Sequence, residues 1–176
     1  GGVEFHSGTQ VLSGENSYTG VTTVAESATL ELKDEGGIAS SSKLALAGTL
    51  DITGVNTVAS LTTLDGDGTV ELGSKRLVVT EASTTYSGEI TGTGGFEVSG
   101  GTQTLQELTS SSGLIASYGG TVLANGGSVS AGSSASALSI VNGGTITATG
   151  TSLDTDLSTA YASFDESGKV ATFTLA

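Results

Sequence analysis

A short alternating phrase recurs along the whole chain and is the feature that most constrains its fold. Each copy has a small residue or Thr, an apolar residue, an acidic residue in most copies, and a second apolar residue. The copies begin at positions 2, 29, 49, 69, 95, 121, 145 and 169, which are 20 to 27 residues apart. A period of this length is typical of a solenoid, in which each repeat forms one turn and stacks on the previous one.

Short strands fit within each repeat better than helices do. Before residue 150 no stretch combines the 3.6-residue periodicity and low glycine content of a helix of about ten residues. Val, Thr, Leu and Ile instead alternate in short runs, separated by turns that use many of the 28 glycines. The sequence therefore predicts an all-β fold, a parallel β-helix of about seven to eight rungs. Residues 1–176 are expected to form a single β-helix segment. Further short strands are predicted at residues 10–12, 22–24, 43–46, 58–61, 76–79, 102–105 and 138–140.

The alternation also predicts which side chains face inward. Successive side chains on a strand point to opposite faces, so the two apolar residues of each phrase share the buried face. The predicted single inward stack contains Val3/Phe5, Leu30/Leu32, Leu50/Ile52, Val70/Leu72, Phe96/Val98, Val122/Ala124 and Ile146/Ala148.

Residues 151–166 depart from this repeat. Leu153, Leu157, Tyr161 and Phe164 recur at spacings of three and four residues, and Ser152 can cap a helix. The segment is predicted to be a short helix or an irregular loop, with an ordinary coil insertion as the alternative. Residues 151–176 are expected to form a cap or an exposed edge of the solenoid.

The central acids of five phrases predict one acidic outer face, made of Glu4, Glu31, Asp51, Glu71 and Glu97. The simplest interpretation is that these carboxylates keep a β-rich rod soluble and separate from its neighbours. The alternative is a face that binds cations or responds to pH. Protonation would remove the repulsion between stacked acids, so acid is expected to favour lateral self-association.

Calcium is the one metal for which the sequence offers candidates. Asp65, Asp67 and Glu71 lie around the Asp-Gly-Asp-Gly run at 65–68, which resembles part of a calcium-binding loop. The remaining oxygen ligands of such a loop are missing, and a glycine-assisted turn between strands explains the run equally well. No other cofactor is expected.

No catalytic residues are predicted, so the chain is expected not to be an enzyme. His6 is the only histidine, there is no cysteine, and no Gly-x-Ser-x-Gly elbow occurs. Enzymes built on β-helices that cleave polysaccharides combine acid pairs with aromatic sugar platforms, whereas this chain has no Trp and four scattered Tyr. A polysaccharide-degrading enzyme or tailspike fragment is kept as the alternative function.

The net charge of −13, with only five Lys and Arg, argues against nucleic acid and anionic lipid as partners. No apolar run approaches the roughly 20 residues of a membrane helix.

One stretch near the start carries a specific family motif. Leu12-Ser13-Gly14, Asn16, Tyr18-Thr19-Gly20 and Thr22-Thr23 precede the strand 28–32. This pattern resembles the passenger-associated repeat of bacterial autotransporters, the type V secretion proteins, and residues 48–105 are also similar to that family. In physical terms, Asn16 is expected to bond backbone groups at a turn, and Tyr18 to pack its ring on the core with its hydroxyl at the rim.

The resemblance implies a right-handed β-helix that forms one segment of a longer passenger, at the cell surface of a Gram-negative bacterium or secreted from it. Membrane contact is then expected only through an outer-membrane β-barrel outside this segment. The implied function is a rigid stalk and an adhesin in cell–cell or cell–surface attachment, with self-association, a host surface or a glycan as partner. A passive spacer that supports an effector elsewhere in the chain is a further alternative.

Overall fold

The fold is an all-β solenoid built from parallel strands. The computed structural model describes residues 1–106, 109–110, 113–116, 119–125, 128–129, 138–140, 145–149, 152–153 and 173–175. In these ranges the regular structure is entirely β, without a helix. Every ladder between described strands is parallel.

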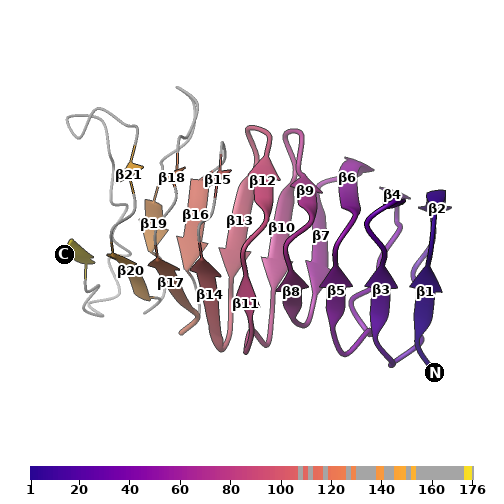
Figure 1. Ribbon diagram of the computed structural model, residues 1–176, viewed down its shortest axis with the longest axis horizontal. Coiled ribbons are helices and arrows are strands. Elements are labelled where there is room, and N and C mark those ends of the chain that lie inside the picture. The colour runs from indigo at the N-terminus through magenta and orange to yellow at the C-terminus, as the bar shows by residue number, and fades with distance from the viewer. Residues whose placement is uncertain are drawn as a thin grey trace.

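Three sheets form the sides of the solenoid, and neighbouring strands within each sheet come from successive turns (Figure 1). The first sheet contains β1 (Val3–Phe5), β3 (Thr22–Val24), β5 (Leu44–Leu46), β8 (Leu64–Gly66), β11 (Thr85–Tyr86), β14 (Thr102–Gln106), β17 (Thr121–Asn125), β20 (Thr145–Thr149) and β22 (Phe173–Leu175). The second sheet contains β2 (Gly8–Leu12), β4 (Ala28–Asp34), β6 (Thr49–Val55), β9 (Thr69–Glu71), β12 (Glu89–Thr91), β15 (Thr109–Ser110), β18 (Ser128–Val129) and β21 (Ser152–Leu153). The third sheet contains β7 (Val58–Leu61), β10 (Arg76–Val79), β13 (Gly95–Val98), β16 (Gly113–Ala116) and β19 (Leu138–Ile140).

The predicted parallel β-solenoid is confirmed, but the predicted number of rungs is not. In the described part of the chain the third sheet has five strands, so about five turns there carry a strand on all three sides. In the first two turns, residues 13–21 and 35–43 close this side with turns, bends and one isolated bridge between Glu15 and Gly37. The short strands predicted from the alternation correspond to β2, β3, β5, β7, β10, β14 and β19.

The predicted helix or loop at 151–166 lies outside the described residues except for Ser152–Leu153, which forms β21. Of the predicted capping region at 151–176, only β21 and β22 are described, and β22 is the last strand of the first sheet.

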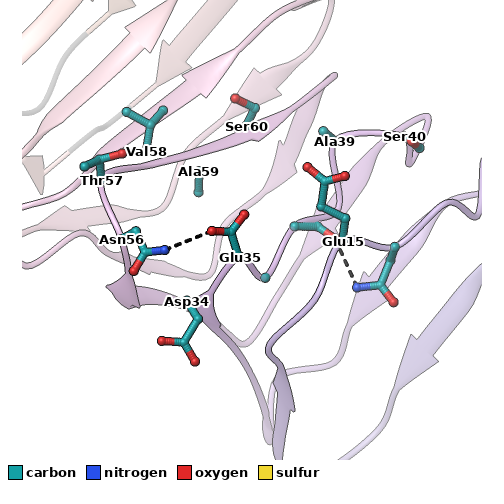
Figure 2. Close-up of a pocket in the computed structure, with 13 residues that line it drawn as sticks. Glu15, Asp34, Glu35, Ala39, Ser40, Asn56, Thr57, Val58, Ala59 and Ser60 are labelled. Atoms are coloured by element: carbon teal, nitrogen blue, oxygen red, sulfur yellow. Dashed lines mark hydrogen bonds between the residues drawn. The ribbon is translucent and has the colours of Figure 1, made fainter.

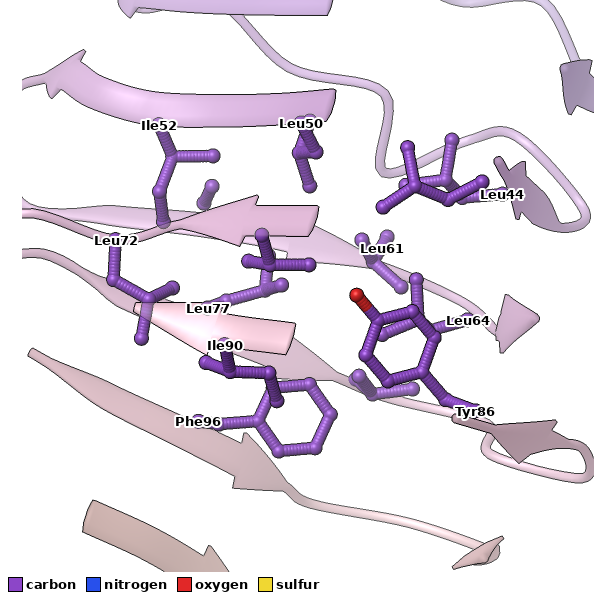
Figure 3. Packing of buried hydrophobic residues seen from close by; sticks show 14 of the residues in the cluster. Leu44, Leu50, Ile52, Leu61, Leu64, Leu72, Leu77, Tyr86, Ile90 and Phe96 are labelled. Carbon is purple, nitrogen blue, oxygen red and sulfur yellow. The ribbon is translucent and has the colours of Figure 1, made fainter. Parts of the chain in front are cut away.

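The core is a column of mainly aliphatic side chains, together with Tyr86 and Phe96, enclosed by the three sheets (Figure 3). Leu30, Leu50, Val70 and Ile90 occupy matching positions on four successive turns of the second sheet, and each is fully buried. Stacking equivalent side chains in this way seals each turn against its neighbours, so a solenoid needs only a thin core. The inward orientation predicted for the phrase is therefore confirmed where the structure describes these side chains, with Val3 and Phe5 only partly buried at the first turn.

The prediction that all phrases share one stack was wrong. The phrases at 29, 49 and 69 lie in the second sheet, but those at 2, 121 and 145 lie in the first and that at 95 in the third. The side on which a phrase falls depends on how many residues separate it from the previous copy. Three copies are spaced by 20 residues and stay in register, whereas spacings of 26 or 27 carry the phrase past a full turn onto another side.

Candidate functional site

The acidic residues predicted as one face are divided among three sheets. Glu31, Asp51 and Glu71 are direct partners on β4, β6 and β9 of the second sheet. They form the acidic ladder, a name used below for these three residues only. The predicted single column is therefore correct over three turns.

The structure places the other two predicted acids away from the acidic ladder. Glu4 lies on β1 beside Thr23 in the first sheet. Glu97 lies on β13 beside Val78 in the third sheet, where the side chain is only 9% exposed and its Oε2 is 3.2 Å from Arg76 Nη1. The phrase of Glu4 begins 27 residues before the phrase of Glu31, and the phrase of Glu97 begins 26 residues after that of Glu71. Both distances exceed the 20-residue spacing within the acidic ladder.

Two local contacts partly offset the repulsion within the acidic ladder. Lys33 Nζ is 2.8 Å from Glu31 Oε1, and this carboxylate raises the pKa of Lys33. Asp51 Oδ1 accepts a hydrogen bond of 2.8 Å from the backbone N–H of Thr53. Glu71 is exposed at the end of β9. The acidic ladder is thus a row of carboxylates that is half-buried at Glu31 and Asp51 and exposed at Glu71.

The calcium candidates do not form a metal site in the part of the chain that the structure describes. Asp65 lies on β8 of the first sheet and forms an ion pair with Lys43, with 2.9 Å between Asp65 Oδ2 and Lys43 Nζ. Glu71 lies on β9 of the second sheet. Among the described residues, no three His, Cys, Asp or Glu side chains are grouped closely enough to hold a metal ion.

His6, the only histidine, is on the surface beside Glu4. Its side chain is 80% exposed, and its Nε2 lies 3.5 Å from Glu4 Oε2. Glu4 is also largely exposed, so this pair lies at the solvent surface.

The family-like motif at the first turn has the structural roles that were predicted. The side-chain amide of Asn16 donates to the carbonyl oxygens of Gly14 (2.9 Å) and Gly37 (3.1 Å), which ties two successive turns together. Tyr18 packs against the core, and its hydroxyl lies 2.8 Å from Thr22 Oγ1. Thr22 is buried and donates in turn to Ser41 Oγ at 2.9 Å.

A cavity on the third side was not foreseen from the sequence. Its volume is about 330 Å³, which falls within the range of small-ligand pockets. It lies between the isolated bridge residue Glu15, the turn after β4, and the segment 56–60 that contains most of β7 (Figure 2). We call this cavity, with its lining residues 15–16, 34–37, 39–40 and 56–60, the β7 groove.

The turn after β4 opens the groove. Asp34, the last residue of β4, has a φ of 54°, a left-handed conformation that Asp tolerates better than most residues. The chain then bends through Gly36 and Gly37 instead of continuing as a strand, although Ile38 still reaches the core. Asn56 holds the far wall in place, because its N–H donates to the carbonyl oxygen of Asp34 (3.1 Å) and its side-chain amide to Glu35 Oε1 (3.3 Å).

One sequence signal could have located the groove. Residues 35–43 lack the alternation of apolar residues by which strands such as 44–46 and 50–52 can be recognised. A turn with no strand on one side leaves the next strand on that side without a neighbour. Glu15, Glu35 and Val58 belong to no repeated phrase. They line the same cavity because no strand at 35–43 separates them.

The geometry defines the chain as a parallel β-solenoid with an acidic ladder on one side and a groove on another. We found no match to the chain among family models, curated proteins or solved structures. In the described residues, no helix is long and apolar enough to cross a membrane.

Proposed function

We propose that this chain is a rigid stalk segment of a surface-exposed autotransporter passenger, and that the stalk also mediates adhesion between cells or to a surface. In this proposal the solenoid is right-handed, has seven to eight rungs over its full length, and has no catalytic activity of its own. It belongs at the surface of a Gram-negative bacterium or among its secreted proteins.

The observation that carries the stalk proposal is the continuity of the ladders. The first and second sheets pair strand to strand from β1 to β22 and from β2 to β21 without a change of direction. A rod of this kind holds its length because each turn is bonded to the next along several sides. The motif from Leu12 to Thr23 adds the family resemblance on which the cell-surface assignment depends.

Adhesion is supported by the outer residues of the strands. The outward positions of the first and second sheets include many Thr side chains, such as Thr23, Thr29, Thr49 and Thr69. Single contacts through such hydroxyls are weak, but a row of them at the spacing of the turns can act together against a second rod or a glycan.

The test is to display residues 1–176 on bacterial cells from a heterologous surface anchor. We expect the cells to settle and to attach to abiotic or host-cell surfaces faster than cells that carry the anchor alone. The matched control displays the Leu50→Asp variant, in which a charge in the core disrupts the turn while the surface composition hardly changes.

Two results would contradict the proposal. Equal settling and attachment by all three strains would remove the adhesive role and leave a spacer. Release of reducing sugar from surface polysaccharide by the purified segment would favour the enzymatic alternative.

A further inference from the structure

The backbone of β7 is paired on one side only. The third sheet ends at β7, whose single strand neighbour is β10. Arg76 N–H donates to the carbonyl oxygen of Thr57 (3.4 Å) and Thr80 N–H to that of Leu61 (3.0 Å). Successive residues of a parallel strand direct their backbone groups to opposite neighbours. The N–H and C=O groups of Val58 and Ser60 therefore point away from β10 and toward the β7 groove.

The previous turn does not supply a strand on that side. Residues 38–41 form a turn closed by a hydrogen bond of 2.9 Å from Ser41 N–H to the carbonyl oxygen of Ile38. Ala39 and Ser40 are exposed on the opposite wall of the groove. Val58, on β7, is 40% exposed, so an apolar side chain and an open strand edge face the same cavity.

The charge around this edge is negative. The lining includes the acids Glu15, Asp34 and Glu35 and no Lys, Arg or His. The carboxylates of Glu15 and Glu35 lie in the space between the two walls, while that of Asp34 points away from them (Figure 2). A cation also lies close to the rim, because Lys75 Nζ donates to the carbonyl oxygen of Asn56 at 3.1 Å.

We infer that the β7 groove binds an extended peptide segment of another protein that carries Lys or Arg, and that this segment adds to the third sheet as a strand beside β7. Strand addition to an open edge gains affinity from main-chain hydrogen bonds and specificity from the side chains that flank them. Here Val58 and Ser60 offer the backbone groups, and Glu15 and Glu35 select cationic side chains.

A second copy of this chain is a poorer occupant. The chain carries a net charge of −13, and its strands present Glu and Asp at outward positions. Pairing such a strand with the acidic groove would bring like charges together, which opposes association. A site for a peptide at β7 exists whether or not the solenoid acts as an adhesive stalk.

The first experiment measures binding of a fluorescent peptide probe to the whole chain. The probe alternates Lys and Val, because β-branched residues favour an extended backbone. Two matched control probes are used. In one, Glu replaces Lys, and in the other, the sequence is kept but the backbone nitrogens are methylated. We expect only the unmethylated Lys probe to bind, and we expect it to slow amide hydrogen exchange at Val58 and Ser60.

The second experiment separates the strand edge from its charge. Ser60→Pro removes an N–H that faces the groove, and it leaves the hydrogen bonds from β7 to β10 in place. The double variant Glu15→Gln/Glu35→Gln removes the two charges but keeps an acceptor for Asn56. Its matched control is Glu26→Gln/Glu81→Gln, two exposed acids outside the groove.

We expect Ser60→Pro and the groove double variant each to weaken binding of the Lys probe about tenfold or more, and the control double variant to leave it unchanged. Tight binding of the methylated probe would overturn the inference, because it would mean charge attraction alone. This result needs only the unmodified chain and decides the matter even if Ser60→Pro does not fold. Failure of the Lys probe to bind, or a concentration-dependent dimer of the chain that the probe cannot displace, would also overturn it.

Discussion

Among the described residues, Tyr86 is the largest polar side chain that the core encloses. It lies on β11 and is fully buried, and its hydroxyl donates to the carbonyl oxygens of Gly68 (2.7 Å) and Glu89 (3.2 Å). Gly68 belongs to the previous turn, so this hydroxyl links two turns from the inside. Burial raises the pKa of the Tyr86 hydroxyl, with smaller contributions from the charges of Asp67 and Glu89.

Replacing Tyr86 by Phe should destabilise the fold by about 1–2 kcal/mol at neutral pH, because the ring stays and one buried hydrogen-bonding group is lost. The raised pKa also makes a prediction for alkaline solution. The stabilisation from the neutral hydroxyl is fully present below the unfolded pKa of about 10 and is lost as the pH rises through the higher folded pKa.

Urea unfolding from neutral to alkaline pH measures both effects. The unmodified protein should lose stability above about pH 10 more steeply than Tyr86→Phe, so the two curves should converge. Curves that stay parallel through this range would contradict the assignment of the alkaline loss to Tyr86.

In the acidic ladder, the strand register determines which carboxylates lie opposite each other and therefore repel each other. Asp51 is the central residue and faces Glu31 on one side and Glu71 on the other. Like charges opposite each other in a ladder are destabilising. Asn at position 51 would keep an acceptor for the Thr53 N–H and remove one charge from both pairs.

Asp51→Asn should therefore raise the free energy of unfolding by about 0.5 kcal/mol in dilute buffer at neutral pH. The gain should shrink in concentrated salt, which screens exposed charges. Thermal or urea unfolding at two salt concentrations provides the measurement, with Glu26→Gln as a control outside the acidic ladder. An equal gain in the control would assign the effect to net charge instead.

The sequence predicted the positions of the strands better than it predicted which of the three sheets each strand joins. Alternating apolar residues located β3, β7 and β10 to the residue, because a half-buried strand requires that pattern whichever side it occupies. Because the pattern is the same on every side of the solenoid, it did not indicate to which of the three sheets a strand belongs. A phrase such as 95–98 looks like 69–72, and only the corner lengths between them place one on the third sheet and the other on the second.

The candidate site was predictable only in part for the same reason. Glu31, Asp51 and Glu71 could be aligned because equal spacing preserves register. The β7 groove depends on the absence of a strand at 35–43, which is shared only by residues 13–21 of the turn before, and on Asp34, the one non-glycine residue with a positive φ in the described part of the chain. A repeated sequence pattern indicates only the features that most turns share, so it does not reveal a departure confined to the first two turns.

At the scale of the whole molecule, charge is expected to control association of the rods. The chain has a net charge of −13 and a sequence pI near 4.1, so repulsion between molecules falls as the pH approaches that value. We expect light scattering to report larger particles at about pH 4.5 than at about pH 7, with reversal on neutralisation. No change in particle size between the two conditions would contradict this expectation.

The pairing of every turn with its immediate neighbours also bears on how such chains change length in evolution. Leu30 pairs with Leu50, and Leu50 pairs with Val70, so the core residues of one turn are covered by those of the next turn. Duplicating or deleting one whole repeat would create a new junction resembling the existing ones and leave distant turns untouched. Gene segments that encode single coils can therefore be gained or lost, whereas an insertion of half a coil would move every later phrase to another side of the solenoid.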